Sequence, residues 1–195
     1  MQTQTKKRYY SPQEYLELEE AAEYKSEYID GEIVPMTGGS INHNRIIVNF
    51  AAFLKFALRG KGYELFTSDV RVWIPSYRIY TYPDVMVISG EPVLHENRTD
   101  TITNPLMIAE VLSKSTKNYD QGDKFDYYRS IPNFREYVLI NQYKFHVQHF
   151  AKTPDGKWLL TDYESADSVL PLSAFEFQIQ LSDIYEGVNF EMNEE

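Results

Sequence analysis

Two short apolar stretches, each interrupted by one carboxylate, constrain the fold of this chain more than any other feature of its sequence. The stretch 82–88 contains Asp84, and the stretch 107–113 contains Glu110. Apolar, β-branched runs of this length are typical of strands buried on both faces of a sheet. An ionised carboxylate in such a strand is costly unless a cation or a hydrogen-bond donor compensates it. We therefore expect a buried sheet with a polar site where these two strands meet.

The two carboxylates allow two interpretations. If the strands pair, Asp84 and Glu110 come together, and at about 4 Å they repel each other by roughly 4 kcal/mol at an effective dielectric constant of about 20. A divalent cation removes this repulsion. Mg²⁺, with Mn²⁺ as a substitute, prefers hard oxygen ligands such as these carboxylates, the carbonyl of Val111 and water. In the alternative, Asp84 closes a Tyr-Pro-Asp turn and Glu110 pairs with a lysine, and spacing by itself favours neither interpretation.

A lysine near the carboxylates would complete a hydrolytic site, because it could orient water or brace a phosphate. In the helix predicted after the second stretch, Asp120, Lys124 and Tyr128 recur at i, i+4 spacing and therefore share one face. The competing interpretation of this pattern is a surface ion pair between Asp120 and Lys124. Lys114 is a second candidate, because it has the same strand parity as Glu110. We favour Lys124 over Lys114.

Length and composition indicate one globular domain over residues 1–195, with flexible ends at 1–9 and 190–195. The chain has no cysteine, which excludes disulfides, a thiol nucleophile and zinc–thiolate sites and fits a reducing compartment. The first eight residues lack the apolar core of a signal peptide, and the most apolar segment, 46–58, is too short to span a bilayer. We therefore expect a soluble, cytoplasmic protein without a membrane partner.

Net charge opposes broad, nonspecific binding to nucleic acid. The chain carries a formal charge of −10, which repels a phosphate backbone. Between residues 113 and 135, however, five Lys and Arg residues stand against three Asp residues. This segment is either a positive rim beside the carboxylates or a solvated helix face of mixed charge.

Hydrophobic periodicity and turn residues predict the order of the elements. Ser11, Pro12 and Glu14 mark a helix start with a capping box, and Asp30-Gly31 marks a hairpin turn. The predicted helices cover 11–22, 43–57 and 119–130; the predicted strands cover a hairpin at 27–34 and then 63–67, 70–74, 83–88, 106–113, 136–140, 144–151, 158–163 and 175–181, with an exposed loop at 90–104. This order predicts an α+β fold, an α/β sandwich in which helices flank a central mixed β-sheet, with a C-terminal β extension.

Several of these residues match one family in combination. They are Glu27 with Asp30-Gly31-Glu32, His43, Tyr82-Pro83-Asp84-Val85, Glu110-Val111-Leu112-Ser113 with Ser115-Thr116, then Asp120, Lys124 and Tyr128, and finally Pro132-Asn133-Phe134-Arg135-Glu136-Tyr137. With them the chain resembles the Uma-type, restriction-endonuclease-like family of the PD-(D/E)XK nuclease superfamily, over nearly everything from residue 10 to about residue 185.

The resemblance implies a restriction-endonuclease-like core and hydrolysis of phosphodiester bonds with a divalent metal. It implies that Asp84 and Glu110 are metal ligands and that Lys124 is the active-site lysine. The superfamily has a lysine where this chain has Leu112, so Lys124 would be a displaced equivalent. Glu27 would supply a further carboxylate from the N-terminal region.

His43 supports opposite interpretations. The residue lies on the apolar face of its predicted helix, which favours a position in the core. The resemblance instead places it beside the site.

Three functions fit these expectations. The leading hypothesis is a Mg²⁺-dependent endonuclease that cleaves DNA. The alternatives are a catalytically inactive interaction or assembly module on the same fold and a metal-dependent hydrolase of small phosphoesters. We also expect a homodimer, because an acidic chain of this size needs extra surface to hold a duplex and the aromatic-rich C-terminal strand offers an edge for pairing.

Overall fold

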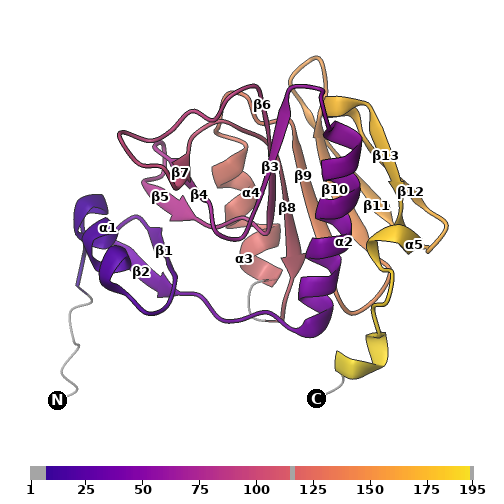
Figure 1. Ribbon diagram of the computed structural model, residues 1–195, viewed down its shortest axis with the longest axis horizontal. Helices are drawn as coiled ribbons and strands as arrows, with labels where there is room; N and C mark the ends of the chain where they lie inside the picture. The colour runs from indigo at the N-terminus through magenta and orange to yellow at the C-terminus, as the bar shows by residue number, and fades with distance from the viewer. Residues whose placement is uncertain (1–7, 115–116, 194–195) are drawn as a thin grey trace.

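A six-stranded mixed sheet forms the centre of the molecule (Figure 1). The computed structural model describes residues 8–114 and 117–193. The strand order is β11-β10-β9-β8-β6-β3, and β8 runs parallel to β9 whereas all other neighbours are antiparallel. The strands are β3 (Tyr63–Thr67), β6 (Val85–Ser89), β8 (Pro105–Leu112), β9 (Glu136–Asn141), β10 (Val147–Lys152) and β11 (Trp158–Tyr163). The predicted central mixed sheet is confirmed.

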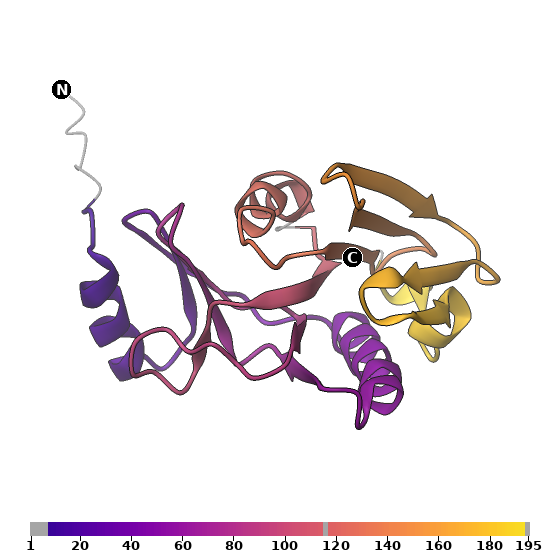
Figure 2. The same ribbon diagram turned by 90° about the horizontal axis from the view of Figure 1, so that it is seen from above.

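Helices cover both faces of this sheet, as Figure 2 shows from above. On one face lie α2 (Ile41–Leu58) and the C-terminal extension, which consists of β12 (Val169–Leu172), a 3₁₀ turn at Ser173–Phe175, β13 (Phe177–Gln180) and α5 (Leu181–Ile184). On the other face lie the short helices α3 (Lys117–Gln121) and α4 (Asp123–Tyr128). Alternate residues of each central strand enter one of two apolar cores, so that Ala109 packs toward α2 and Ile108 toward α4.

A second sheet extends the molecule on its N-terminal side. It has the order β2-β1-β5-β4-β7 and is formed by β1 (Ser26–Ile29), β2 (Glu32–Pro35), β4 (Arg71–Ile74), β5 (Ile79–Thr81) and β7 (Thr101–Ile102). Helix α1 (Pro12–Ala21) packs on it through Tyr15, whose ring stacks on Tyr28 and Tyr80. This tyrosine cluster is a small core of its own.

Local signals in the sequence predicted several element ends correctly. The Ser11 hydroxyl accepts a hydrogen bond from the Glu14 N–H, and the Glu14 side chain accepts one from the Ser11 N–H, which completes the predicted capping box. At the hairpin turn, Asp30 and Gly31 have φ values of 39° and 100°. Both values lie in the left-handed region, which explains the Asp-Gly pair.

Other predictions are wrong. The single helix expected at 119–130 is two helices, interrupted at Gly122. The expected loop at 90–104 contains β7, and the expected strand 175–181 begins with the end of a 3₁₀ turn and ends in α5. Strands β5 and β12 were not predicted, since runs of three or four residues are too short to show a period.

The two chain ends lie partly outside the described residues. Of the ends predicted to be flexible, residues 1–7 and 194–195 are not described. Within the described part, Tyr10 donates a backbone hydrogen bond to Gly31, and Phe190–Asn193 form a 3₁₀ turn. No helix in the described ranges is long and apolar enough to cross a membrane.

Candidate active site

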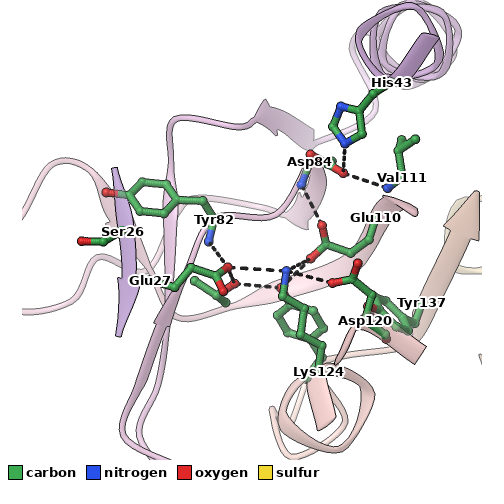
Figure 3. A network of polar contacts seen from close by, with 12 residues as sticks. Ser26, Glu27, His43, Tyr82, Asp84, Glu110, Val111, Asp120, Lys124 and Tyr137 are labelled. Carbon is green, nitrogen blue, oxygen red and sulfur yellow. Dashed lines mark hydrogen bonds and ion pairs between the residues drawn. The ribbon is translucent and has the colours of Figure 1, made fainter. Parts of the chain in front are cut away.

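A cleft of about 680 Å³ lies where the N-terminal sheet, the start of α2 and the ends of β6 and β8 come together. Its lining includes most of the side chains that the sequence singled out: Glu27, His43, Asp84, Glu110, Lys114, Asp120 and Lys124, together with Val111. The structure therefore brings residues from five different elements and their flanking loops into one site (Figure 3).

Asp84 and Glu110 are adjacent because β6 and β8 pair antiparallel with Val85 opposite Ala109. The Val111 N–H donates to Asp84 Oδ2 at 2.7 Å, and the Asp84 N–H donates to Glu110 Oε2 at 3.3 Å (Figure 3). The pairing expected from the two apolar stretches is thus present. The ion pair of the alternative interpretation is also present, because Glu110 contacts a lysine. The two interpretations therefore do not exclude each other.

Lys124 is that lysine, and it is shared among three carboxylates. Its Nζ lies 3.1 Å from Glu110 Oε1, 3.2 Å from Asp120 Oδ1 and 3.4 Å from Glu27 Oε1. Asp120 and Lys124 are only 2% and 6% exposed, so the interpretation as a surface ion pair is wrong. The helix break at Gly122 separates α3 from α4 but keeps both side chains directed at the site.

Tyr128 and Lys114 occupy different positions around this group. The Tyr128 hydroxyl is buried and donates to Glu110 Oε1 at 2.9 Å. Lys114 is an exposed residue of the cleft lining, and its ammonium lies 5.8 Å from the centre of the Tyr143 ring. Of the two candidate lysines, Lys124 is therefore the one in contact with the carboxylates.

Glu27 reaches the site from the N-terminal sheet. Because β1 pairs with β5, Glu27 lies beside Thr81, whose hydroxyl donates to Glu27 Oε1. The Tyr82 N–H donates to the same oxygen at 3.4 Å. This carboxylate is buried, and its ion pair with Lys124 links the N-terminal sheet to α4.

His43 lies in the site and not in the core, so its interpretation as a core histidine is wrong. It is in the first turn of α2, where the Ser40 hydroxyl accepts a hydrogen bond from its N–H, and its Nε2 lies 3.3 Å from Asp84 Oδ2. Gly39 permits this position, since a Cβ on Gly39 would be 2.6 Å from the His43 Nδ1. Burial lowers the pKa of His43, but the hydrogen bond and charge of Asp84 outweigh burial and raise it overall.

The site holds more negative than positive charge. Burial raises the pKa of Glu110 to about 8; Lys124 opposes this rise, and the charges of Asp84, Asp120 and Glu27 add to it. Burial alone would lower the pKa of Lys124, but Glu110 and Glu27 outweigh it, and the pKa lies above the usual value. Four carboxylates thus share one ammonium and one imidazole.

This donor set fits a divalent cation that keeps part of its water shell. Within residues 8–114 and 117–193, no three His, Cys, Asp or Glu side chains converge as a ready-made metal cage. Asp84 and Glu110 nevertheless supply two hard oxygen donors at one end of the sheet, and the Val111 backbone lies against Asp84. Mg²⁺ is commonly bound by one or two carboxylates with water in the remaining positions.

Thr81 and Tyr119 are among the polar residues of the site that were not predicted. Thr81 belongs to β5, a strand that the sequence pattern did not reveal, so nothing in the sequence marked it. Tyr119 lines the cleft beside Lys124, with the Lys124 Nζ 5.4 Å from its ring centre. Its position next to Asp120, on the predicted site helix, was the available signal.

The fold is that of a restriction-endonuclease-like protein. A crystal structure from Anabaena variabilis, described as a "putative nuclease belonging to DUF820", superposes with a TM-score of 0.74 at 17% sequence identity and covers 92% of this chain and 99% of that chain. At this identity the likeness shows the fold.

The chain belongs to the Uma2 family, described as "Putative restriction endonuclease", whose model matches residues 12–183. Two proteins of Synechocystis sp., both described as uncharacterized, are similar to it. The protein sll1609 is 45% identical over 82% of this chain and 90% of its own length. The protein slr1290 is 36% identical over 92% of this chain and 93% of its own length. The family and the fold class expected from the sequence are therefore confirmed.

Proposed function

We propose that this protein is a divalent-metal-dependent endonuclease that hydrolyses the phosphodiester bonds of DNA. One observation carries the proposal: Asp84 and Glu110, from neighbouring strands, line the same cleft, and the Lys124 ammonium lies 3.1 Å from Glu110. The description of the Uma2 family supports a nuclease. The description of the Anabaena variabilis protein as a "putative nuclease" points to the same class of activity.

Asp84, Glu110 and the Val111 carbonyl are the groups that would hold the metal, with water as the remaining ligands. We propose Mg²⁺, with Mn²⁺ as a substitute, because all three donors are hard oxygens. When bound, such an ion lowers the pKa of a water ligand and neutralises charge on a phosphoryl oxygen. The four carboxyl groups in the described lining of the cleft outnumber its two lysines, which supports a cation at this place.

The chain's own residues would then position and stabilise the reacting groups. Lys124 would stabilise the negative charge that develops on the phosphate, from a position that Glu27 and Asp120 hold through ion pairs. The Tyr128 hydroxyl would keep Glu110 oriented, and His43 would do the same for Asp84. Because all of these groups are largely buried, their charges act in a medium of low dielectric constant, where electrostatic stabilisation is strong.

A homodimer remains a prediction. The central sheet ends at β11, where Leu159 and Leu160 are 58% and 46% exposed, and this exposed apolar edge supports pairing between two copies. Light scattering at micromolar concentration is expected to report twice the 22.9 kDa mass of the chain. A single species of 22.9 kDa would contradict the dimer without affecting the proposed chemistry.

The test pairs metal titration with DNA cleavage. Isothermal titration with Mg²⁺ and Mn²⁺ and nicking of supercoiled plasmid are measured for the wild type and for Glu110→Gln purified in parallel. We expect the wild type to bind metal and nick the plasmid and the variant to lose both.

Three results would contradict the proposal. Equal nicking by the variant would assign the activity to a contaminant. Metal binding without nicking would favour the interaction module, which the charge of −10 also favours. Hydrolysis of bis(p-nitrophenyl) phosphate with no attack on DNA would favour the small-phosphoester hydrolase.

A further inference from the structure

Part of the cleft wall is apolar and open to solvent. Ile29, Val34, Pro35 and Met36, from the β1–β2 hairpin and the segment after it, line the same cleft as the carboxylates. Val34 and Met36 are 38% and 37% exposed. Exposed apolar surface at the edge of a polar site marks a place where a ligand with an apolar face is bound.

Aromatic rings add to this wall. Tyr119 and Tyr143 line the cleft and are partly exposed. Bases of unpaired nucleic acid stack on such rings whatever their sequence, because every base has a π-face. In a duplex the faces of the bases are covered by their neighbours, so a wall of this kind has nothing to contact there.

The charges of the cleft also oppose a duplex. Among its described lining residues Lys114 and Lys124 are the Lys and Arg side chains, and Lys124 is buried in ion pairs with three carboxylates. Duplex DNA carries one charge per ~1.7 Å of axis, and proteins that grip it neutralise several phosphates at once. This cleft cannot do so, whereas a strand held by its bases needs fewer phosphate contacts.

The Tyr119 hydroxyl is placed to anchor such a ligand. Its oxygen is buried and has no hydrogen-bond partner among the described residues of the chain, although it belongs to the lining of the cleft. A buried hydroxyl without a partner is unfavourable, so an acceptor on a bound ligand would satisfy it. The oxygens of a base or a phosphate are acceptors of this kind.

From these observations we propose that the cleft takes up an unpaired nucleotide, so that the substrate is single-stranded DNA or a strand displaced from its duplex. This inference rests on the proposed nuclease and names the substrate of the same site. Val34 and Met36 contact the base or the sugar, Tyr119 donates a hydrogen bond, and the reacting phosphate lies toward Asp84 and Glu110. The volume of about 680 Å³ suits one nucleotide, since it falls within the usual range for clefts that enclose a small ligand.

Fluorescence anisotropy with a labelled 12-nucleotide DNA tests the preference. The wild-type protein is titrated in Ca²⁺, without Mg²⁺ or Mn²⁺, against the oligonucleotide as a single strand and as a blunt duplex of the same sequence. We expect the single strand to bind at least about tenfold more tightly at physiological salt, with a shallow salt dependence that corresponds to about one or two phosphate contacts. Equal or tighter binding of the duplex would overturn the inference.

Matched variants test where the strand binds. Tyr119→Phe removes one hydroxyl that has no intramolecular partner, so folding should be retained while binding of the single strand weakens by roughly 3- to 10-fold. Val34→Thr should weaken it by about 2- to 3-fold, because an isosteric polar group replaces an apolar one. Val169→Thr is the control, since Val169, like Val34, lies in an edge strand and is 40% exposed against 38% for Val34.

The outcomes separate this inference from the proposed function. An unchanged affinity in Tyr119→Phe, or an equal effect of Val34→Thr and Val169→Thr, would overturn the inference. Hydrolysis of relaxed duplex as fast as single strand would also overturn it but leave the nuclease intact. If the single strand binds tightly, Tyr119→Phe weakens this binding and no hydrolysis occurs, the cleft is supported as a single-strand site and the proposed nuclease activity is contradicted.

Discussion

Two buried clusters of polar side chains lie on opposite faces of the central sheet and invite comparison. On the face covered by α3 and α4, Glu110 of β8 contacts Lys124 and Tyr128. On the face covered by α2 and the C-terminal extension, Glu136 of β9 lies near His149 and Ser173. The two glutamates are 3% and 1% exposed, yet Glu110 lines the cleft and Glu136 does not.

The difference lies in the partners. Glu136 Oε1 accepts hydrogen bonds from the Ser173 N–H at 2.7 Å, the Ser173 hydroxyl at 2.8 Å and the Ala174 N–H at 3.2 Å. These neutral donors begin the 3₁₀ turn of the C-terminal extension, so this carboxylate fastens the extension to β9. Glu110 instead faces ionised groups, including three further carboxylates that raise its pKa. Neutral donors therefore make Glu136 a structural tie, whereas the charged neighbours of Glu110 suit the metal site proposed for it.

The largest expected effect is that of Lys124→Met. Removing the ammonium leaves Glu27, Glu110 and Asp120 as buried carboxylates without their shared cation. We expect the free energy of unfolding in EDTA to fall by about 3–5 kcal/mol. Cleavage should fall by at least about 10²-fold. Urea denaturation and plasmid nicking measure the two effects.

Lys114→Met is the control for this variant. Because Lys114 is exposed, its loss should change stability by less than about 0.5 kcal/mol and reduce cleavage only mildly. If Lys114→Met abolished cleavage while Lys124→Met did not, the roles assigned to the two lysines would be wrong.

Paired glutamine substitutions test the comparison itself. Glu110→Gln should reduce cleavage by about 10²- to 10³-fold with little loss of stability, because it removes a proposed metal ligand but keeps a polar side chain of the same size. Glu136→Gln should leave cleavage unchanged but lower the free energy of unfolding by about 1–2 kcal/mol, because the bonds to Ser173 and Ala174 lose their charge. Nicking rates measure cleavage and urea titrations measure stability for both variants. If both variants lost the same property, the two clusters would not have separate roles.

The pH dependence of stability should also distinguish the two clusters, and the expected effect is of intermediate size. The pKa of Glu110 is about 8 in the folded protein against an ordinary value of 4.5. Between these values the folded state holds a proton that the unfolded state has released, so the free energy of unfolding falls as pH rises from 4.5 to 8. In EDTA, the wild type should lose more stability from about pH 5 to about pH 8 than Glu110→Gln. Parallel curves for the two proteins would refute this assignment.

Apart from the Lys114→Met control, the smallest expected effect is that of Ser173→Ala. Ser173 is exposed, and its hydroxyl supplies one of the three bonds to Glu136 while its N–H retains another. We expect a loss of about 0.5–1 kcal/mol in the free energy of unfolding and no change in cleavage. Thermal and urea unfolding measure the loss. A change in the nicking rate would show that the C-terminal extension communicates with the cleft.

Local signals in the sequence were sufficient for much of the fold and for the central pair of the site. Apolar runs around Asp84 and Glu110 predicted two strands that share a polar site, and the structure pairs them. The i, i+4 spacing identified Lys124 and Tyr128 as neighbours on one helical face, and both contact Glu110. Capping and turn residues located α1 and the first hairpin. All of these features depend on residues close in sequence, where side-chain period and backbone preference act directly.

Only the tertiary structure decided which side chains joined this pair and which were excluded. Glu27 reaches Lys124 because β1 pairs with β5, a strand of three residues that no periodicity could reveal. The His43 side chain contacts Asp84 and not the apolar core, and Gly39, which has no Cβ, leaves room for its ring. Glu110 and Glu136 occupy similar apolar strands, and their surroundings differ through residues that are distant in the chain, such as Glu27 near Glu110 and Ala174 beside Glu136. A carboxylate's role depends on the charges and donors around it, and packing brings these together from elements that are distant in sequence.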